Sequence, residues 1–171
     1  MFCAHIATIE DFGFYASMLR DPEWIENSGF SADDFVNDQQ ILRFVCPQND
    51  GETKWVFSLE KTGEPVAFCH FIKRKGGWTD VFGGMIKHFH NSATSIRSYV
   101  FALDNYFRLT SCTELHCAIY ENNIRSMKMN MSMGFHVIGQ MHYDVRLFNK
   151  LRLTKEDFYS SPVPIRLLKT I

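Results

Sequence analysis

Several signals that assign a protein to a special class are missing from this chain of 171 residues. No apolar run approaches the roughly 20 residues that a membrane-spanning helix needs. The chain does not begin with a basic segment followed by an apolar one, as a signal peptide would. The formal net charge is only −1, so no charge excess indicates binding to nucleic acid or to an anionic membrane. We therefore expect neither a nucleic-acid nor a membrane partner.

Cysteine pairs at metal-binding spacing are also absent. The five cysteines are an odd number at irregular spacings, and no C-x-x-C pair occurs among them. This pattern does not suit a zinc site. Most of the five lie in apolar runs, where a free thiol packs as a small core residue. We expect a cytoplasmic protein, because a reducing compartment keeps such thiols free.

The chain does contain enough apolar surface for one sizeable core. Hydrophobic residues make up 46% of the sequence and aromatic residues 15%, with sixteen Phe. A chain of this length suits one domain. We therefore predict a single domain over residues 1–171.

Apolar spacing predicts a chain that mixes strands with helices. The pattern over 95–109 is the strongest, because its apolar residues fall on one face of a helix. Gly83-Gly84 predicts a bulge or a point where a strand splays from its neighbour. The predicted strands are 2–9, 55–60, 66–73, 78–86, 114–120 and 135–147, and the predicted helices are 11–20, a stretch starting at 21, 31–45, 95–109, 124–133 and 154–159.

The segment after the strand-like run 114–120 is the most informative part of the sequence. It contains Asn123, a helical stretch, and then Gly134-Phe135 before another strand-like run. It resembles the C-terminal half of the GCN5-related N-acetyltransferase (GNAT) fold, where this segment has the pattern N-x-x-A/S-x-x-x-Y-x-x-x-G-F. Asn123, Gly134 and Phe135 match that pattern in register. Ser126 matches it too, whereas Asn130 stands in the position of the Tyr.

The order of the predicted elements also matches the GNAT order across essentially the whole chain. The resemblance implies an α/β (α+β mixed sheet) protein with a central twisted mixed sheet of six to seven strands, flanked by about four to five helices. It divides the single domain into an N-terminal substrate-side half (1–60), an acyl-CoA-binding core (61–147) and a C-terminal extension (148–171).

GNAT enzymes bind the pyrophosphate of acetyl-CoA on a loop with the pattern R/Q-x-x-G-x-G/A that leads into a helix. Free N–H groups and the helix dipole favour an anion at that position. His90 takes the Arg/Gln position here, and Ala93 and Ser95 take the two small positions. A Ser/Thr helix cap without any ligand is the alternative. The resemblance implies an acyl-CoA site formed by Met85, Ile86, Lys87, His90, Asn91, Ser92, Ala93, Thr94, Ser95, Ile96, Arg97, Asn123, Ser126 and Asn130.

Acetyl transfer to an amine requires a base for the amine and a proton donor for the CoA thiolate. In many GNAT enzymes the Tyr of the fourth helix is that donor, but Asn130 cannot supply a proton at neutral pH. We predict Tyr120 as a substitute, and Asp80 and His116 as candidates for the base. A rim aromatic and a structural histidine are the alternatives for Tyr120 and His116. The further candidates are Ser126 and Ser132 for the acid, and His88 and His90 for the base.

His88 and His90 form an H-x-H pair, but no acidic third ligand occurs at a set spacing, so we expect no metal. The N-terminal helices carry acidic residues that would suit a cationic amine if they lined the site. A solvated helix face is the other interpretation of the same residues. They are Asp21, Glu23, Glu26, Asp33, Asp34 and Asp38.

The resemblance implies an acyl-CoA-dependent N-acyltransferase. Acetyl-CoA would be the cosubstrate, and a primary amine of a small molecule or a protein would be the acceptor. The alternative is a catalytically inactive GNAT-fold binding or assembly module, which fits the missing Tyr and the altered loop. A third hypothesis, an aminoacyl-tRNA donor, would require a basic face that the net charge does not support. The sequence leaves open whether the protein forms a homodimer.

Overall fold

A seven-stranded mixed sheet forms the centre of the protein, in a computed structural model that describes residues 2–90 and 92–169. The strands are β1 (Phe2–Ile6), β2 (Glu52–Leu59), β3 (Pro65–Lys73), β4 (Thr79–Met85), β5 (Glu114–Tyr120), β6 (His136–Tyr143) and β7 (Arg146–Thr154). Their order in the sheet is β1-β2-β3-β4-β5-β7-β6. Only β4 and β5 run parallel, and every other neighbouring pair is antiparallel.

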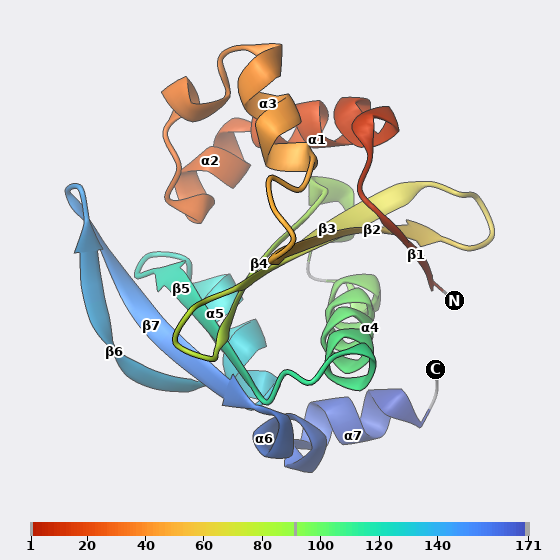
Figure 1. Ribbon diagram of the computed structural model, residues 1–171, viewed down its shortest axis with the longest axis vertical. Coiled ribbons are helices and arrows are strands. Elements are labelled where there is room, and N and C mark those ends of the chain that lie inside the picture. The colour runs from red at the N-terminus through yellow and green to blue at the C-terminus, as the bar shows by residue number, and fades with distance from the viewer. Residues whose placement is uncertain (1, 91, 170–171) are drawn as a thin grey trace.

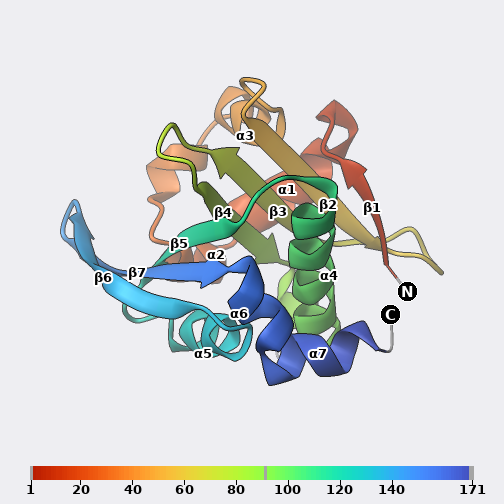
Figure 2. The ribbon, with the colours of Figure 1, turned by 60° about the horizontal axis from the view of Figure 1, so that its bottom comes forward.

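Helices cover both faces of the sheet. They are α1 (Phe12–Leu19), α2 (Pro22–Ser28), α3 (Asp38–Val45), α4 (Ala93–Leu109), α5 (Ile124–Ser132), α6 (Lys155–Ser160) and α7 (Pro162–Leu168). Figure 1 shows α1, α2 and α3 together on one side of the sheet and α4 on the other. Figure 2 shows α5, α6 and α7 on the side of α4. The described residues form seven helices where the resemblance implied about four to five; five precede the last strand, and the short pair α6 and α7 follows it.

Capping residues set where the N-terminal helices begin. The expected helix over 31–45 is split, because Asn37 interrupts it. The Asn37 side chain accepts a hydrogen bond from the backbone N–H of Gln40, whose own side chain accepts one from Asn37. The first strand likewise ends at Ile6 rather than residue 9, since Thr8 caps a short 3-10 turn. Both corrections arise from local caps that compete with the apolar pattern.

The C-terminal strands differ from the sequence prediction. The strand expected over 135–147 is a hairpin, because the chain turns at Asp144, which has a positive φ of 52°. β7 pairs with β5 on one edge and with β6 on the other. Residues 148–154 therefore lie inside the sheet rather than in a C-terminal extension. Alternation continues across the turn, which is why the sequence pattern did not reveal it.

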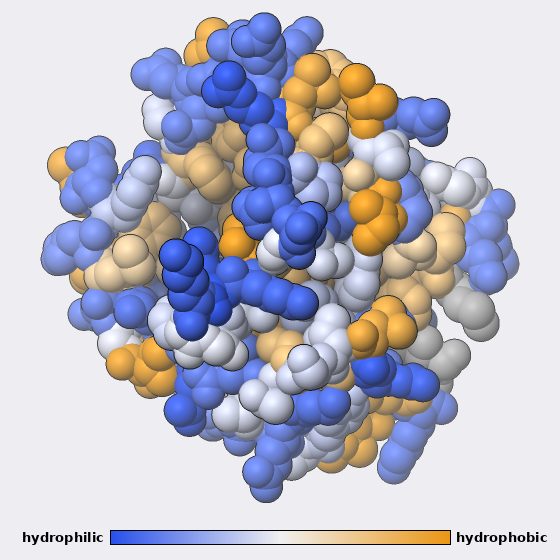
Figure 3. All heavy atoms as spheres, viewed as in Figure 1, coloured by the Kyte–Doolittle hydropathy of each residue, from blue (hydrophilic) through white to orange (hydrophobic). Residues whose placement is uncertain are grey.

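Two apolar clusters hold the helices to the sheet. The cluster on the α4 side includes Phe71 and Tyr106, whose rings stack with centroids 3.8 Å apart. The cluster under the N-terminal helices includes Tyr15 and Phe68, with ring centroids 5.0 Å apart. Burying each such ring stabilises the fold by roughly 1.5–3 kcal/mol. The outer face in Figure 3 is largely hydrophilic, with apolar residues in small separate groups.

β4 and β5 separate soon after they meet. They pair only at two positions, Thr79 with Leu115 and Asp80 with His116. Beyond these pairs the strands run on without any ladder partner on their facing edges, among the residues that the structure describes. The pairing of β4 with β3 stays in regular register past Gly83, so the strand splays and does not bulge. The splay opens a space in the middle of the sheet.

Candidate functional site

A cavity of about 790 Å³ occupies the space between the diverging strands. β4 and β5 form two of its walls, and the C-terminal end of α2 borders it. The face of α4 that it meets carries Ser95, Ser98, Tyr99 and Ala102, which recur at helical spacing. Asn123 and much of α5 complete the lining. The site therefore draws on elements from most of the chain.

The first turn of α4 opens toward this cavity. Ser92 caps the helix, because its Oγ accepts from the N–H of Ser95 at 3.3 Å and donates to the carbonyl of Phe89 at 2.6 Å. Ala93 is the first helical residue, so this position needs no positive φ and the Ala carries no backbone cost. The remaining N–H groups and the dipole of this 17-residue helix favour an anion.

His90 presents an unpartnered ring nitrogen at the cavity. Its Nε2 lies 2.9 Å from the carbonyl oxygen of Met85. Because a carbonyl only accepts, Nε2 must carry the hydrogen and donate it. The other nitrogen, Nδ1, is buried and has no hydrogen-bond partner within the described residues. A buried polar atom without a partner is costly, so Nδ1 suits a ligand group or a bound water.

Glu23 on α2 gathers three basic side chains at the rim of the cavity. Its carboxylate lies 2.7 Å from Lys87 Nζ, 3.8 Å from Arg125 Nη1 and 3.9 Å from His90 Nδ1. The hydrogen bond and charge of Lys87 hold the pKa of Glu23 below its usual value. These groups are solvent-exposed or partly so, and such pairs contribute little to stability. Phosphate groups of a ligand would meet the same basic side chains.

Asn123 joins the two sides of the cavity. Its Oδ1 accepts from the N–H of Ser126 at 3.0 Å and so caps α5. Its Nδ2 donates to the carbonyl of Asn27 on α2 at 2.9 Å. The motif residue Asn123 therefore starts one helix and anchors another that lies 96 positions earlier in the chain.

Asn130 is buried and lies next to a tyrosine from another helix. Its Oδ1 accepts a hydrogen bond from the Tyr99 hydroxyl at 2.9 Å, and its Nδ2 donates to the Ser126 carbonyl at 2.9 Å. Burial raises the pKa of Tyr99 well above its usual value, with Cys117 as a smaller contributor. A phenol therefore lies beside the position where the GNAT pattern has its Tyr. Sequence reasoning missed Tyr99, because its only signal was membership of the apolar face of the helix.

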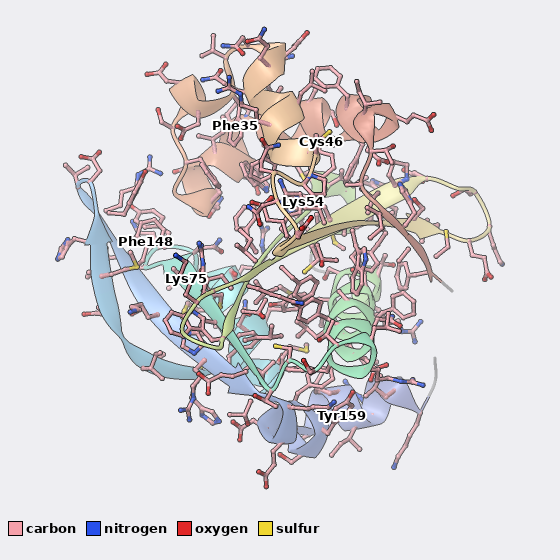
Figure 4. The ribbon with its side chains drawn as sticks, in the orientation of Figure 1. Phe35, Cys46, Lys54, Lys75, Phe148 and Tyr159 are labelled. Atoms are coloured by element: carbon pink, nitrogen blue, oxygen red, sulfur yellow. The ribbon has the colours of Figure 1, made fainter. Side chains whose placement is uncertain are left out.

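Tyr120 also lines the cavity. Its hydroxyl accepts from Asn122 Nδ2 at 3.0 Å, and the Arg146 guanidinium lies 5.5 Å from its ring centroid. Its ring centroid is 5.7 Å from that of Phe148 on β7. Phe148, which Figure 4 labels beside β7, in turn packs so closely on Gly29 that a Cβ at Gly29 would overlap its ring. This stack connects the end of α2 to the C-terminal half of the sheet.

Asp80 and His116, predicted as bases, lie at the closed end of the splay and do not line the cavity. Asp80 accepts hydrogen bonds from Arg74 Nε and from Trp78 Nε1. The His116 ring bonds to the Glu114 carboxylate and stacks on Trp78 with centroids 5.4 Å apart. Both side chains therefore have partners of their own away from the cavity.

The residues expected to hold acyl-CoA divide into two groups. Ser92 caps α4 just outside the lining, and Lys87 and Arg97 are exposed. Ile86, Ala93 and Thr94 do not line the cavity either, and Asn91 lies outside the described residues. Those that line it are Met85, His90, Ser95, Ile96, Asn123, Ser126 and Asn130.

No metal-binding group of three or more His, Cys, Asp or Glu side chains occurs in residues 2–90 and 92–169. Over the same residues, no helix has the length and apolar character to cross a membrane. All five cysteines are free thiols.

Neither a protein-family model nor a curated protein matches this sequence. Solved structures do match its fold. One is an aminoglycoside acetyltransferase, AAC(6')-Ib, in complex with ribostamycin and coenzyme A. Its TM-score is 0.75 at 13% sequence identity, and the match covers 94% of this chain and 97% of the acetyltransferase chain. A spermidine N-acetyltransferase from Vibrio cholerae, in complex with CoA and spermine, has a TM-score of 0.79 at 8% identity. The match covers 93% of this chain and 98% of the spermidine N-acetyltransferase. An uncharacterised protein from Bacillus halodurans has a TM-score of 0.80 at 9% identity. The match covers 99% of this chain and 91% of the Bacillus halodurans protein.

Proposed function

We propose that this chain, which has the fold of the GNAT acetyltransferases, transfers an acetyl group from acetyl-CoA to a primary amine. The observation that carries the proposal is the splay of β4 from β5, with a cavity of about 790 Å³ between them and the first turn of α4 beside it. A catalytically inactive binding module is the second candidate, favoured by Asn130 in the Tyr position.

The residues present fit an acyl-CoA. The first turn of α4 offers N–H groups to phosphate, and the orphan Nδ1 of His90 lies beside it. Lys87 and Arg125 add positive charge at the rim. The unpaired edges of β4 and β5 offer backbone donors and acceptors to the amides of the pantetheine arm.

The chemistry forms a C–N bond and breaks a C–S bond. Acetyl-CoA, when bound, supplies the acetyl group and a thiolate leaving group that needs a proton. The Tyr99 hydroxyl is our candidate for the donor of that proton, because it lines the cavity beside Asn130, the residue in the motif's Tyr position, and its O–H can turn from Asn130 Oδ1 to the sulfur. Tyr120 remains a candidate at the same cavity. This proposal gives Asp80 and His116 no part in the proton transfers, because neither residue lines the cavity.

Ligand-dependent unfolding of a charge variant tests the site. Acetyl-CoA or CoA in hundredfold excess over its Kd should stabilise the wild-type protein by about 2.7 kcal/mol. Ser95→Glu places a negative charge where the phosphates would bind, so we expect it to remove the stabilisation while the protein still folds. The matched control is Ser111→Glu, which adds the same charge near the other end of α4, at an exposed position.

Equal stabilisation of the wild type and Ser95→Glu would show that the first turn of α4 is only a cap. An unshifted melting temperature in the folded wild type would favour the binding module. A shift by CoA without thiol release from acetyl-CoA, in the presence of a broad set of amines, would mean binding without catalysis.

A further inference from the structure

We infer that the acceptor is an amine that is uncharged at neutral pH and carried on an apolar or aromatic body, rather than a polyamine. The inference rests on the proposed function, since it names the acceptor of the same site. It begins with the charges around the cavity. No Asp or Glu lines the cavity in the described part of the chain, whereas three basic side chains do: His90, Arg125 and Lys128.

The acidic residues at the start of α2 are already engaged. Glu23 is paired with Lys87 at 2.7 Å and lies 3.8 Å from Arg125 Nη1. Asp21 caps α2 by accepting from the N–H of Trp24 at 3.0 Å. Both carboxylates therefore have partners within the protein, and neither lines the cavity.

The other acidic residues of the N-terminal helices also fail to reach the cavity. Asp34 is exposed and accepts from the N–H of Ser31 at 2.7 Å, and Asp38 pairs with Arg20 at 2.7 Å. Of the two interpretations of these residues, the structure supports the solvated helix face. Among the lining residues that the structure describes, a cationic substrate thus finds no compensating carboxylate.

A protonated amine would bear two costs in such a cavity. Moving an ammonium out of water without a partner is strongly unfavourable, and positive charge on Arg125 and Lys128 would add repulsion. The ammonium would also have to lose a proton before it could attack, and none of the described lining residues is a carboxylate that could receive it. An amine that arrives neutral avoids both costs.

Aromatic rings supply the wall that borders the N-terminal helices. Trp24 lies edge-on to Phe82 with ring centroids 6.1 Å apart, and Phe68 lies 5.6 Å from Phe82. All three line the cavity, together with Tyr120. Trp24 is stacked on Phe30 at 5.7 Å, so one of its faces is covered. Cation–π attraction would offset only part of the cost of taking an ammonium out of water, so this wall suits an apolar body better than a cation.

The proton balance of the reaction agrees with a neutral amine. The nitrogen forms the amide bond, the C–S bond breaks, and the amine loses one N–H proton while the sulfur gains one. With a neutral amine no net proton passes to solvent. Tyr99 can carry this exchange, because its hydroxyl can donate one proton and accept another in its place.

Two amines of identical formula separate charge from size. 4-Ethylaniline is neutral at pH 7, whereas its isomer 4-methylbenzylamine is protonated. We expect the CoA-bound protein to bind 4-ethylaniline at least tenfold more tightly in a calorimetric titration at pH 7, and to acetylate it with at least tenfold higher kcat/KM. Spermidine should bind more weakly than either.

A carboxylate added to the wall should reverse this preference. Ala118 lines the cavity from β5 and is exposed to solvent, so it tolerates a larger side chain. Ala118→Asp should shift the affinity ratio of the two isomers at least tenfold toward 4-methylbenzylamine. Ala118→Asn, of equal size but uncharged, should leave the ratio near that of the wild type.

Wild-type protein that binds 4-methylbenzylamine or spermidine as tightly as 4-ethylaniline, or binds none of them, would overturn the inference. The same titrations on CoA-free protein separate this failure from that of the proposed function, because the charge preference belongs to the cavity itself. Absence of CoA binding with the preference intact would overturn only the proposed function.

Discussion

Single residues at the cavity combine structural and chemical roles. Asn130 is 4% exposed, and its amide holds Tyr99 on one side and Ser126 on the other. A Tyr at position 130 would fill this space itself, so the amide leaves room for the phenol of α4. The proton donor of the site can therefore come from a neighbouring helix although the motif position holds an Asn.

Tyr99→Phe tests that assignment. Loss of a general acid lowers kcat by about 10²-fold or more, and we expect that effect with CoA affinity nearly unchanged. In the CoA complex, the absorbance of the thiolate should titrate at higher pH in the variant, because a hydrogen-bond donor to the thiolate is missing. The control is Tyr106→Phe, in the same helix but outside the cavity lining. Identical thiolate titrations in wild type and Tyr99→Phe would remove Tyr99 from the chemistry.

At the scale of elements, local signals were readable from the sequence and long-range pairing was not. The strand Glu114–Tyr120 occurs as predicted, and α2 begins at Pro22, next to the predicted start at residue 21. The β6–β7 hairpin was missed, because alternation does not reveal a turn at Asp144. Asp80 and His116 were expected in the site because they lie on its strands. Only the register of β4 on β5, which no local pattern encodes, places them at the closed end.

Gly134 gives the G-F motif a structural basis that can be measured. It follows α5 with φ of +100°, and a Cβ would lie 2.8 Å from the carbonyl oxygen of Asp157 and would overlap Ser161 Oγ. Gly134→Ala should lower the free energy of unfolding by about 1–2 kcal/mol from the left-handed backbone alone, and further through the contact with α6. Denaturant unfolding measures the change.

The matched control for Gly134→Ala is Gly13→Ala in α1. Nothing lies within 4 Å of a Cβ at Gly13 and its φ is not positive, so we expect a stability gain of up to about 1 kcal/mol. Equal effects of the two substitutions would contradict the role of backbone conformation at Gly134.

At the scale of the whole molecule, the cavity depends on contacts between the N-terminal helices and the C-terminal half. The hydrogen bond from Asn123 to Asn27 and the packing of Phe148 on Gly29 are two such contacts. Both fix the end of α2, which borders the cavity. Changes at either contact should therefore alter the mobility of α2 more than the stability of the sheet.

Asn123→Asp separates these roles of one side chain. The carboxylate can still cap α5 by accepting from Ser126, but it cannot donate to the Asn27 carbonyl. A lost hydrogen bond is worth about 0.5–1.5 kcal/mol, so amide exchange in α2 should accelerate about 2- to 10-fold while α5 keeps its protection. Asn123→Ala should accelerate exchange in both helices. Unchanged exchange of α2 in both variants would show that other contacts hold it.

The place of β7 in the sheet has a consequence for synthesis on the ribosome. Every described residue that lines the cavity precedes Met133, yet β5, one of its walls, is held on its outer edge by β7 (Arg146–Thr154). Its inner edge pairs with β4 at only two positions. During synthesis, all of these lining residues are therefore made before β7 is available to pair with β5 and hold it in place. Until the segment through Thr154 has left the exit tunnel, the edge of β5 is open to chaperones and to neighbouring chains.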